Sequence, residues 1–409
     1  LPVRIQSLNE LGRVDKVIAA SIKSRVILYA ASPLFNGNSE FYAGFTGKDG
    51  SLLFNTEYDN EKWKAAMDAA LEAIQLAEGN GYRLYEYIDF PPDYDSIAYD
   101  SNEVKALYNY RYMFTDKWNT ELIWGHSDPV SGSDWWKIQA AAMMLYPNAP
   151  SEAAWQWVSP TIEIVETYYT ENGLPIDEDL SFFYDQRYGL TLIPEEEGMH
   201  AQEGEVTVRL HLNREPRFYA SIGFDRGINR TWGEKWDLQM RYGEDHGRKA
   251  QTNDYVITGY TLKKICHPFS DGEAYNKLID YPWPIIRLAE LYLNYAEAYN
   301  EYYGPSQEVY DALNQIRERS FVPKVEDAWS NPDFALNLNK HTSQEGLREI
   351  IRQERMIELA FEGHRYYDIR RWKVADQYFN KPVQGWYVDA TILNEFYTLS
   401  DVGQRSFIT

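Results

Sequence analysis

The sequence RMIELAFEGHRYYDIRRWK at residues 355–373 decides more about the fold than any other part of the chain. Thr342 and Glu345 stand upstream of it in the T-x-x-E arrangement of a capping box, so we predict that a helix begins there. Gly363 suits the end of this helix, because the residue that follows a helix often takes a left-handed backbone conformation. The stretch therefore predicts a helix over 343–362 that turns a corner and pairs with the segment after it.

Two carboxylates share the apolar face of this predicted helix. At helical spacing the face consists of Leu347, Ile350, Ile351, Glu354, Ile357, Glu358 and Phe361. Carboxylates in an apolar setting are costly unless each meets a cation. The nearby candidates are Arg352, Arg355, Arg365, Arg370 and Arg371. We predict a partly buried ion-pair network that holds a helix corner, which is a feature of the fold and not a catalytic site.

Five stretches of the chain resemble, in the expected order, segments of the SusD/RagB family, the surface glycan-binding lipoproteins of Bacteroidetes outer membranes. Besides 355–373 they are ASPLFNG at 31–37, TYYTENGLPI at 167–176, REPRFYASI at 214–222 and YPWPIIRLAELYLNYAEAYNE at 281–301. Each is moderately specific, but together they cover nearly the whole chain. The resemblance implies a mainly α, SusD-like fold in which tetratricopeptide-like helical pairs form a scaffold, with long aromatic-rich loops and a few short strands.

Helical periodicity is confined to the two ends of the chain. Apolar residues recur at helical spacing over 13–31, 63–78, 285–303 and 307–319. Between 79 and 284 the periodicity fails, and turn clusters alternate with strand-like runs at 205–212 and 255–264. We predict one SusD-like domain over 1–409, with a helical scaffold at 13–78 and 285–373 and an irregular ligand-binding region at 79–284.

Composition excludes several classes of partner. The formal net charge of −22 argues against nucleic acid, whose binding draws on clustered Lys and Arg. Cys266 is the single cysteine, so we expect no intrachain disulfide and no zinc cluster, and no sequence motif points to a cofactor. No apolar run reaches the roughly 18–20 residues of a membrane-spanning helix.

The two ends of the chain depart from the family pattern. Family members begin with a secretion signal and a lipidated cysteine, and most continue past the arginine-rich corner. We therefore expect N-terminal and C-terminal family segments to be missing here, and membrane association to come only through an N-terminal lipid that this chain lacks. The resemblance implies an outward-facing lipoprotein of the outer membrane, whose helical face docks on a SusC-like TonB-dependent transporter.

Aromatic residues in loops are the main functional signal. The chain has 13 Trp and 33 Tyr, and the tryptophans in polar, loop-like contexts are Trp118, Trp124, Trp135, Trp136, Trp155, Trp157, Trp232 and Trp236. An indole offers the flat apolar surface on which the C–H face of a sugar ring packs. Packing in the core is the competing interpretation for each of them, and Trp124 is interpreted as core.

The predicted ligand site combines four tryptophans with polar neighbours. Trp135 and Trp136 cannot both face one way in a strand, and Trp232 and Trp236 would share a face in a helix. By resemblance, the loops after the ELIW and REPRFYASI segments contribute to the ligand pocket. The predicted ligand-binding residues are Trp135, Trp136, Trp232 and Trp236, with Asp134, Arg226, Asn229 and Arg230 as hydrogen-bonding partners. The expected function is non-catalytic binding of an oligo- or polysaccharide and its delivery to the transporter.

Two other functions remain open at this point. A glycoside hydrolase on a helical scaffold would need two carboxylates roughly 5–10 Å apart, and the candidates are Asp93 with Asp95, Asp177 with Asp179, and Glu195–Glu197. Such acidic runs are more typical of a solvated surface, and no catalytic motif accompanies them. A tetratricopeptide-type scaffold that binds only proteins would have a concave helical groove and few loop tryptophans.

Overall fold

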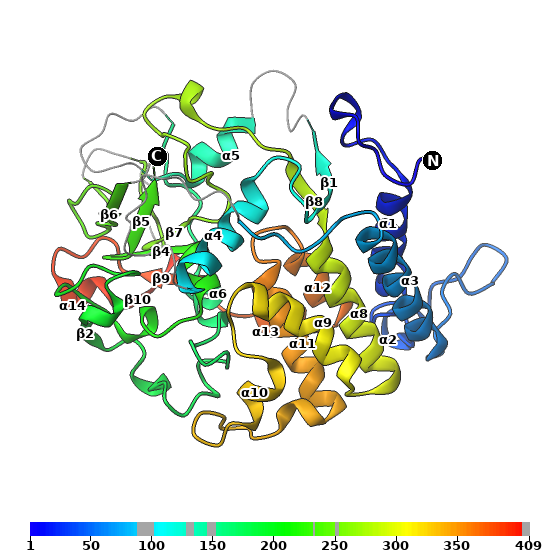
Figure 1. Ribbon diagram of the computed structural model, residues 1–409. Helices are drawn as coiled ribbons and strands as arrows, with labels where there is room; N and C mark the ends of the chain where they lie inside the picture. The colour runs from blue at the N-terminus through cyan, green and yellow to red at the C-terminus, as the bar shows by residue number, and fades with distance from the viewer. Residues whose placement is uncertain (88–101, 128–134, 145–152, 232–233, 250–252, 403–409) are drawn as a thin grey trace.

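Helices gather on one side of the molecule, and strands and loops on the other (Figure 1). The computed structural model describes residues 1–87, 102–127, 135–144, 153–231, 234–249 and 253–402. The scaffold helices are α1 (Lys16–Ala31), α3 (Glu61–Glu78), α8 (Leu288–Tyr303), α9 (Gln307–Arg319), α11 (Gln344–Glu358) and α12 (Arg365–Arg371). Helix α1 packs on α3, α3 packs on α8, and α8 packs on both α9 and α11. The mainly helical fold predicted from the sequence is confirmed.

Most of the predicted scaffold helices lie where the sequence placed them, although the helix predicted over 285–303 begins later than expected. Helix α9 has the predicted bounds, but the predicted helix over 285–303 begins only at Leu288. Residues Trp283–Arg287 form strand β8, which pairs antiparallel with β1 (Leu122–His126). The β-branched pair Ile285 and Ile286 favours a strand, and the partner strand, far away in the chain, decides the outcome.

The helix that closes the scaffold begins one residue later than predicted. Ser343, and not Thr342, caps α11, because the Ser343 Oγ accepts a hydrogen bond from the Gly346 N–H at 3.1 Å. The helix ends at Glu358, four residues before the predicted end. Gly363 nevertheless has the expected left-handed backbone, with φ +87°. The corner is therefore built from a short turn and not from a longer helix.

A buried helix in the middle of the chain was not predicted. Helix α4 (Asn102–Thr115) buries residues on every side, among them Tyr108, Tyr110, Tyr112 and Phe114. A helix buried all round shows no alternation of apolar and polar faces, so its sequence has no helical period to detect. The remaining helices are short: α2 (Ser39–Tyr42), α5 (Trp135–Ala142), α6 (Ile162–Thr167), α7 (Pro216–Ser221), α10 (Val325–Ser330), α13 (Ala375–Phe379) and α14 (Leu393–Phe396).

The strands of the described residues pair two by two in short antiparallel ladders. Besides β1 with β8, the pairs are β2 (Leu190–Leu192) with β3 (Val206–Val208), β4 (Ile222–Phe224) with β7 (Tyr260–Leu262), β5 (Ile228–Thr231) with β6 (Glu234–Asp237), and β9 (Gln384–Trp386) with β10 (Leu399–Asp401). The predicted strands at 205–212 and 255–264 are both shortened to three residues. One apolar cluster joins this half to the helices, because it contains residues such as Phe218, Tyr260, Leu293 and Ile350. The division into one domain with an inserted ligand-binding region stays a prediction.

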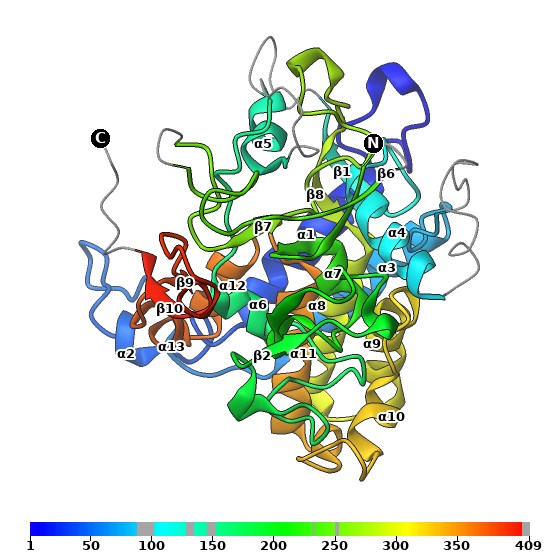
Figure 2. The same cartoon turned by 90° about the vertical axis from the view of Figure 1, so that its left-hand side faces the viewer.

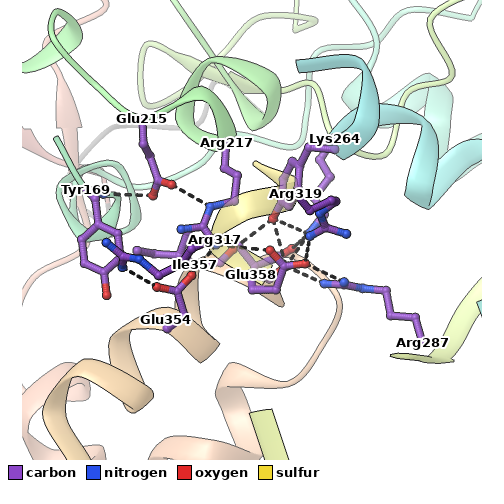
Figure 3. A network of polar contacts seen from close by, with 12 residues as sticks. Tyr169, Glu215, Arg217, Lys264, Arg287, Arg317, Arg319, Glu354, Ile357 and Glu358 are labelled. Atoms are coloured by element: carbon purple, nitrogen blue, oxygen red, sulfur yellow. Dashed lines mark hydrogen bonds and ion pairs between the residues drawn. The ribbon is translucent and has the colours of Figure 1, made fainter. Parts of the chain in front are cut away.

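The buried ion-pair network exists, but the cations that meet Glu354 and Glu358 are not the predicted ones (Figure 3). Glu354 contacts Arg217 at 2.5 Å and Arg317 at 2.8 Å. Glu358 contacts Arg287 at 2.6 Å and Arg217 at 3.3 Å, and it also pairs with Arg319. These arginines come from α7, β8 and α9, far from α11 in the sequence, and all the paired side chains are buried.

The predicted neighbouring arginines have other roles. Arg355 and Arg371 hold the buried Asp368 at 2.8 Å and 2.7 Å, and Arg371 also contacts Glu297 at 2.5 Å. Arg365 pairs with Glu163 of α6 at 3.2 Å. Neighbouring residues of a helix point in different directions around its axis, so Arg355 does not face the same way as Glu354 or Glu358. Because the arginines that do meet these carboxylates come from α7, β8 and α9, the network joins the scaffold to the middle of the chain.

We expect Gly173→Ala to destabilise the protein by about 2–3 kcal/mol, because two costs add at this position. Gly173 has φ +70°, and a Cβ there would lie 2.4 Å from Nη2 of the buried Arg317. Urea unfolding measures the effect. Gly204→Ala is the matched control, because Gly204 has φ +78° in a tight turn with open space around the Cβ position, so it reports backbone strain alone. Equal losses in the two variants would contradict the steric part of the prediction.

Candidate functional site

Three aromatic side chains form an open surface beside α5, which we call the aromatic platform: Trp155, Trp157 and Tyr275. Among the tryptophan side chains that the structure describes, Trp157 alone is widely open to solvent, at 54% exposure. Its ring lies 4.6 Å from that of Trp155, tilted by 34°. Tyr275, 38% exposed, meets Trp155 edge-on at 6.4 Å. The platform thus offers flat apolar area to a ligand from solution.

The backbone between the two tryptophans explains why their rings meet. Gln156 has φ +57°, a left-handed conformation that costs a non-glycine residue about 1–2 kcal/mol. The end of α5 holds it in place, since the Trp155 N–H donates to the Ala140 carbonyl at 2.7 Å and the Trp157 N–H to the Ala141 carbonyl at 2.6 Å. These bonds satisfy carbonyls that a helix end leaves unpaired. Helix α5 therefore fixes the platform.

The Gln156 side chain also carries an unsatisfied polar atom. It is buried, and its Oε1 atom receives no hydrogen bond from the described residues. A buried acceptor without a donor costs about 1–3 kcal/mol, so native structures contain few of them. Strain and an unsatisfied polar atom at one residue are more typical of a functional site than of a loop that merely connects two elements.

Polar groups surround the rings. The Trp157 Nε1–H donates to Asp254 Oδ1 at 2.7 Å, which holds the indole at one angle. In the loop that carries Tyr275, the Lys277 ammonium pairs with Asp271 at 3.1 Å and also with Glu273. Carboxylate and ammonium groups beside an aromatic face suit a sugar, whose hydroxyls need hydrogen-bonding partners while its C–H face packs on the ring.

The platform lies at the end of the molecule opposite α10. Figures 1 and 2 both place α5 at one extreme of the fold and α10 at the other. The Ala153 N–H donates to the Gly272 carbonyl at 2.9 Å, so the segment with the tryptophans and the loop with Tyr275 are tied together.

The structure scatters the tryptophans that the sequence selected. Asp134 and Trp232 lie outside the described residues. Trp135 and Trp136 begin α5, next to the platform in the chain, but their side chains are not described. Trp236 is 6% exposed and stacks on His246 at 5.2 Å, in the core. The helix in which Trp232 and Trp236 would share a face does not form at Trp236, because Glu234–Asp237 form strand β6.

Two of the predicted polar partners are buried, and a third is half-buried. Arg226 is buried and paired with Glu205 and Asp225 at 3.3 Å and with Glu244 at 2.5 Å. Asn229 is buried in β5, and the half-buried Arg230 donates one hydrogen bond, at 3.3 Å, to the Met199 carbonyl. The contacts named here do not join this group to the described part of α5. The ligand-binding roles of these residues stay predictions.

The sequence does contain a signal for the platform. Trp155 and Trp157 are among the loop tryptophans, although the family resemblance points to Trp135, Trp136, Trp232 and Trp236. Their spacing of two residues places both rings on one side of an extended segment, and this pattern could have found them. Tyr275 has no comparable signal, because its contact with Trp155 joins segments more than a hundred residues apart.

Two members of the acidic runs considered for a hydrolase, Asp179 and Glu197, have structural partners. Asp179 is buried and accepts a hydrogen bond from Thr170 Oγ1 at 2.5 Å. Glu197 is buried and accepts one from the Tyr219 hydroxyl at 3.1 Å. Residues 93 and 95 lie outside the described part of the chain. In the described residues no group of three or more His, Cys, Asp or Glu is placed to hold a metal ion.

A cleft lies between the start of α4 and the end of α9. This cleft of about 800 Å³ is lined mainly by carboxylates and aromatic rings, including Glu103, Glu171, Glu197, Tyr219, Phe321 and Asp327. No tryptophan lines it. The cleft therefore lacks the large flat surface that the aromatic platform provides. In the described residues, no helix is both long enough and apolar enough to cross a bilayer.

Comparison with known proteins relates this architecture to one family. The family model described as "SusD family" matches residues 99–407. SusD-like protein P2 of Formosa agariphila is 40% identical over 94 residues, which are 23% of this chain and 17% of that protein. The aligned part thus spans well under two thirds of this curated relative.

Two solved structures resemble the fold over almost the whole chain. The protein BT4246 superposes with a TM-score of 0.79 and 30% identity, over 98% of this chain and 68% of its own. A SusD-like protein from Bacteroides fragilis gives a TM-score of 0.63 and 24% identity, over 94% of this chain and 59% of its own. The second likeness speaks for the fold alone.

Proposed function

The chain belongs to the SusD family, and on that basis we propose that it binds an oligo- or polysaccharide at the cell surface without chemical change and passes it to a SusC-like TonB-dependent transporter. The observation that carries the proposal is the aromatic platform beside α5. In this proposal the protein is an outward-facing lipoprotein of the outer membrane, attached through an N-terminal lipid outside this chain.

Stacking on the platform would supply much of the binding free energy. By analogy with contacts between aromatic side chains, each open ring contributes about 1–2 kcal/mol. Trp157 is already held by Asp254 and by the backbone bonds to α5, so little conformational freedom is lost when a sugar binds. Trp135 and Trp136 are kept in this proposal as ligand-binding residues, and Arg230 would supply a polar contact.

Trp157→Ala is expected to weaken glycan binding by about 5- to 30-fold, the equivalent of losing one stacked ring. Isothermal titration against a panel of oligosaccharides measures the affinity. Phe183→Ala is the matched control, because Phe183 is also an exposed aromatic ring and is not one of the three platform residues. The control is expected to bind as the unchanged protein does.

Two results would count against this assignment. Unchanged affinity of Trp157→Ala for every glycan that the unchanged protein binds would remove the platform as the site. Shorter sugars accumulating in the titrated samples would favour the hydrolase alternative, since a binding protein returns its ligand intact. Chromatography of the same samples after titration distinguishes the two.

A further inference from the structure

Three basic side chains lie together without a carboxylate partner: Arg111 on α4, Arg230 on β5, and Lys263 just after β7. In the described part of the chain each donates only to backbone carbonyls. The chain as a whole carries 62 acidic against 40 basic residues. In so acidic a protein a cluster of cations without a counter-ion is unexpected, because a charge removed from water normally requires an opposite charge.

Arg111 is the most deeply placed of the three, with 6% exposure. Its Nη1 donates to the Arg230 carbonyl at 3.2 Å and its Nη2 to the Cys266 carbonyl at 3.4 Å. Both distances are long for a charged donor, which normally approaches an acceptor to about 2.7–2.9 Å. Its Nε has no acceptor among the residues that the structure describes. The guanidinium therefore has unused capacity to bind an anion.

The other two cations lie nearer to solvent. Arg230 and Lys263 are half-buried. The Lys263 ammonium donates to the Tyr219 carbonyl at 2.6 Å and to the Ile228 carbonyl at 3.1 Å. Burial lowers the pKa of Lys263 well below its usual value, and the positive charges of Arg111 and Arg230 lower it further. The Ile228 and Arg230 carbonyls that accept from Lys263 and Arg111 are two residues apart on β5, so both charged groups meet the same edge of this strand.

We propose that Arg111, Arg230 and Lys263 form a binding site for an oxyanion, namely a sulfate or carboxylate group on the bound glycan. A sulfate or carboxylate would accept from both guanidinium groups and the ammonium, and its charge would relieve their mutual repulsion. Arg230 and Lys263 are the half-buried members of the site, and Arg111 is the buried one. The assignment to a glycan rests on the proposed function, whereas the anion site itself does not.

The site is connected to the aromatic platform through one segment of the chain. The Cys266 carbonyl that receives Arg111 begins the loop that leads to Tyr275. The next residue, His267, donates its N–H to Gln139 on α5 at 3.1 Å. Helix α5 therefore supports both the platform and the loop over the cations. An acidic polysaccharide could place sugar rings on the platform and an anionic group at the three cations.

Inorganic sulfate tests the site without a glycan. We expect sodium sulfate to raise the Tm of the unchanged protein more than sodium chloride at equal ionic strength, and Arg230→Gln to lose most of this difference. Arg230→Lys should keep most of it. Sulfate also stabilises proteins by exclusion from their surface, so the comparison between variants is the informative one. An equal sulfate effect in the unchanged protein and in Arg230→Gln would overturn the proposal.

A control variant removes one positive charge elsewhere. Arg13 is exposed and paired with Glu10, so Arg13→Gln changes the net charge by the same amount as Arg230→Gln. We expect Arg13→Gln to respond to sulfate as the unchanged protein does. A loss of the sulfate effect in this variant as well would mean that only net charge matters, and it would also overturn the proposal.

Pairs of glycans distinguish the source of the anion. A sulfated galactan oligosaccharide is titrated beside its desulfated form, and a uronic-acid oligosaccharide beside its carboxyl-reduced form. We expect at least one charged member to bind about tenfold more tightly than its neutral form, and Arg230→Gln to abolish that ratio. Trp157→Ala should weaken charged and neutral members alike. Equal binding of charged and neutral members would reject the anion site and leave the proposed glycan binding intact. Unchanged binding of both members by Trp157→Ala would instead reject the platform.

Discussion

Glu358→Gln is expected to lower the free energy of unfolding by about 3–5 kcal/mol, the cost of removing one partner from a buried group of charges. Glu358 is fully buried among Arg217, Arg287 and Arg319 (Figure 3). Burial by itself would raise the pKa of this carboxyl, but the three arginines together with Lys264 hold it far below its usual value. Without the carboxylate these cations would stay buried and repel one another.

Urea unfolding at neutral pH measures this loss. Glu10→Gln is the matched control, because Glu10 pairs with Arg13 at the exposed surface, where an ion pair contributes about 0–1 kcal/mol. The network also joins α11 to α7, β8 and α9, so we expect both halves of the unchanged protein to unfold together. A loss below about 1 kcal/mol would show that Glu358 does not hold the two halves together.

The protein is expected to lose stability steeply in acid, mainly between about pH 4.5 and pH 2. The pKa of Glu362 is about 2, because Arg287 and Lys264 outweigh the opposing effect of burial. The pKa of Asp368 is also about 2, because Arg355 and Arg371 outweigh burial in the same way. Both carboxyls have lower pKa values in the folded chain than in the unfolded chain.

The sign of the effect follows from these lowered pKa values. Above the pKa of the unfolded carboxyl, near 4, the ionised form stabilises the fold in full, by about 2–3 kcal/mol for each group. As the pH falls, the unfolded chain binds protons first, and the stabilisation is gone once the pH passes below the folded value. Urea titrations from about pH 7 to about pH 2 measure the decline.

Asp368→Asn separates one contribution from the rest. We expect this variant to be less stable at neutral pH and to depend less on pH in acid, since one of the titrating groups is gone. A free energy of unfolding that stays constant from about pH 5 down to about pH 3 would contradict the assigned ionisation of both carboxylates.

The predicted helices succeeded where one face of each is buried and the other is not. Helix α9 has the predicted bounds, since its apolar residues recur at helical spacing and Gly304 and Pro305 precede it. Helix α4 escaped detection because both of its sides are buried. Strand β8 was mistaken for the first turn of a helix, because its partner β1 is more than a hundred and fifty residues away.

The candidate site was predictable in kind and not in place. The sequence indicated that loop tryptophans would form the ligand surface, and an open pair of indoles exists at Trp155 and Trp157. It could not tell which indoles stay open. Trp236 looked as polar in its surroundings as Trp157, yet it packs on His246 in the core. Exposure depends on which distant segment covers a ring, and local composition does not contain that information.

The sequence by itself determined the mainly helical fold, the family, and the presence of buried carboxylates on α11 that require cations. Spacing and residue type carry these features, because they depend on neighbours within a few turns of helix. Only the tertiary structure decided that Arg217, Arg287, Arg317 and Arg319 meet those carboxylates, and that three other cations are left with carbonyls alone. Charge pairs form between groups that folding brings together, and their distance in space is unrelated to their distance along the chain.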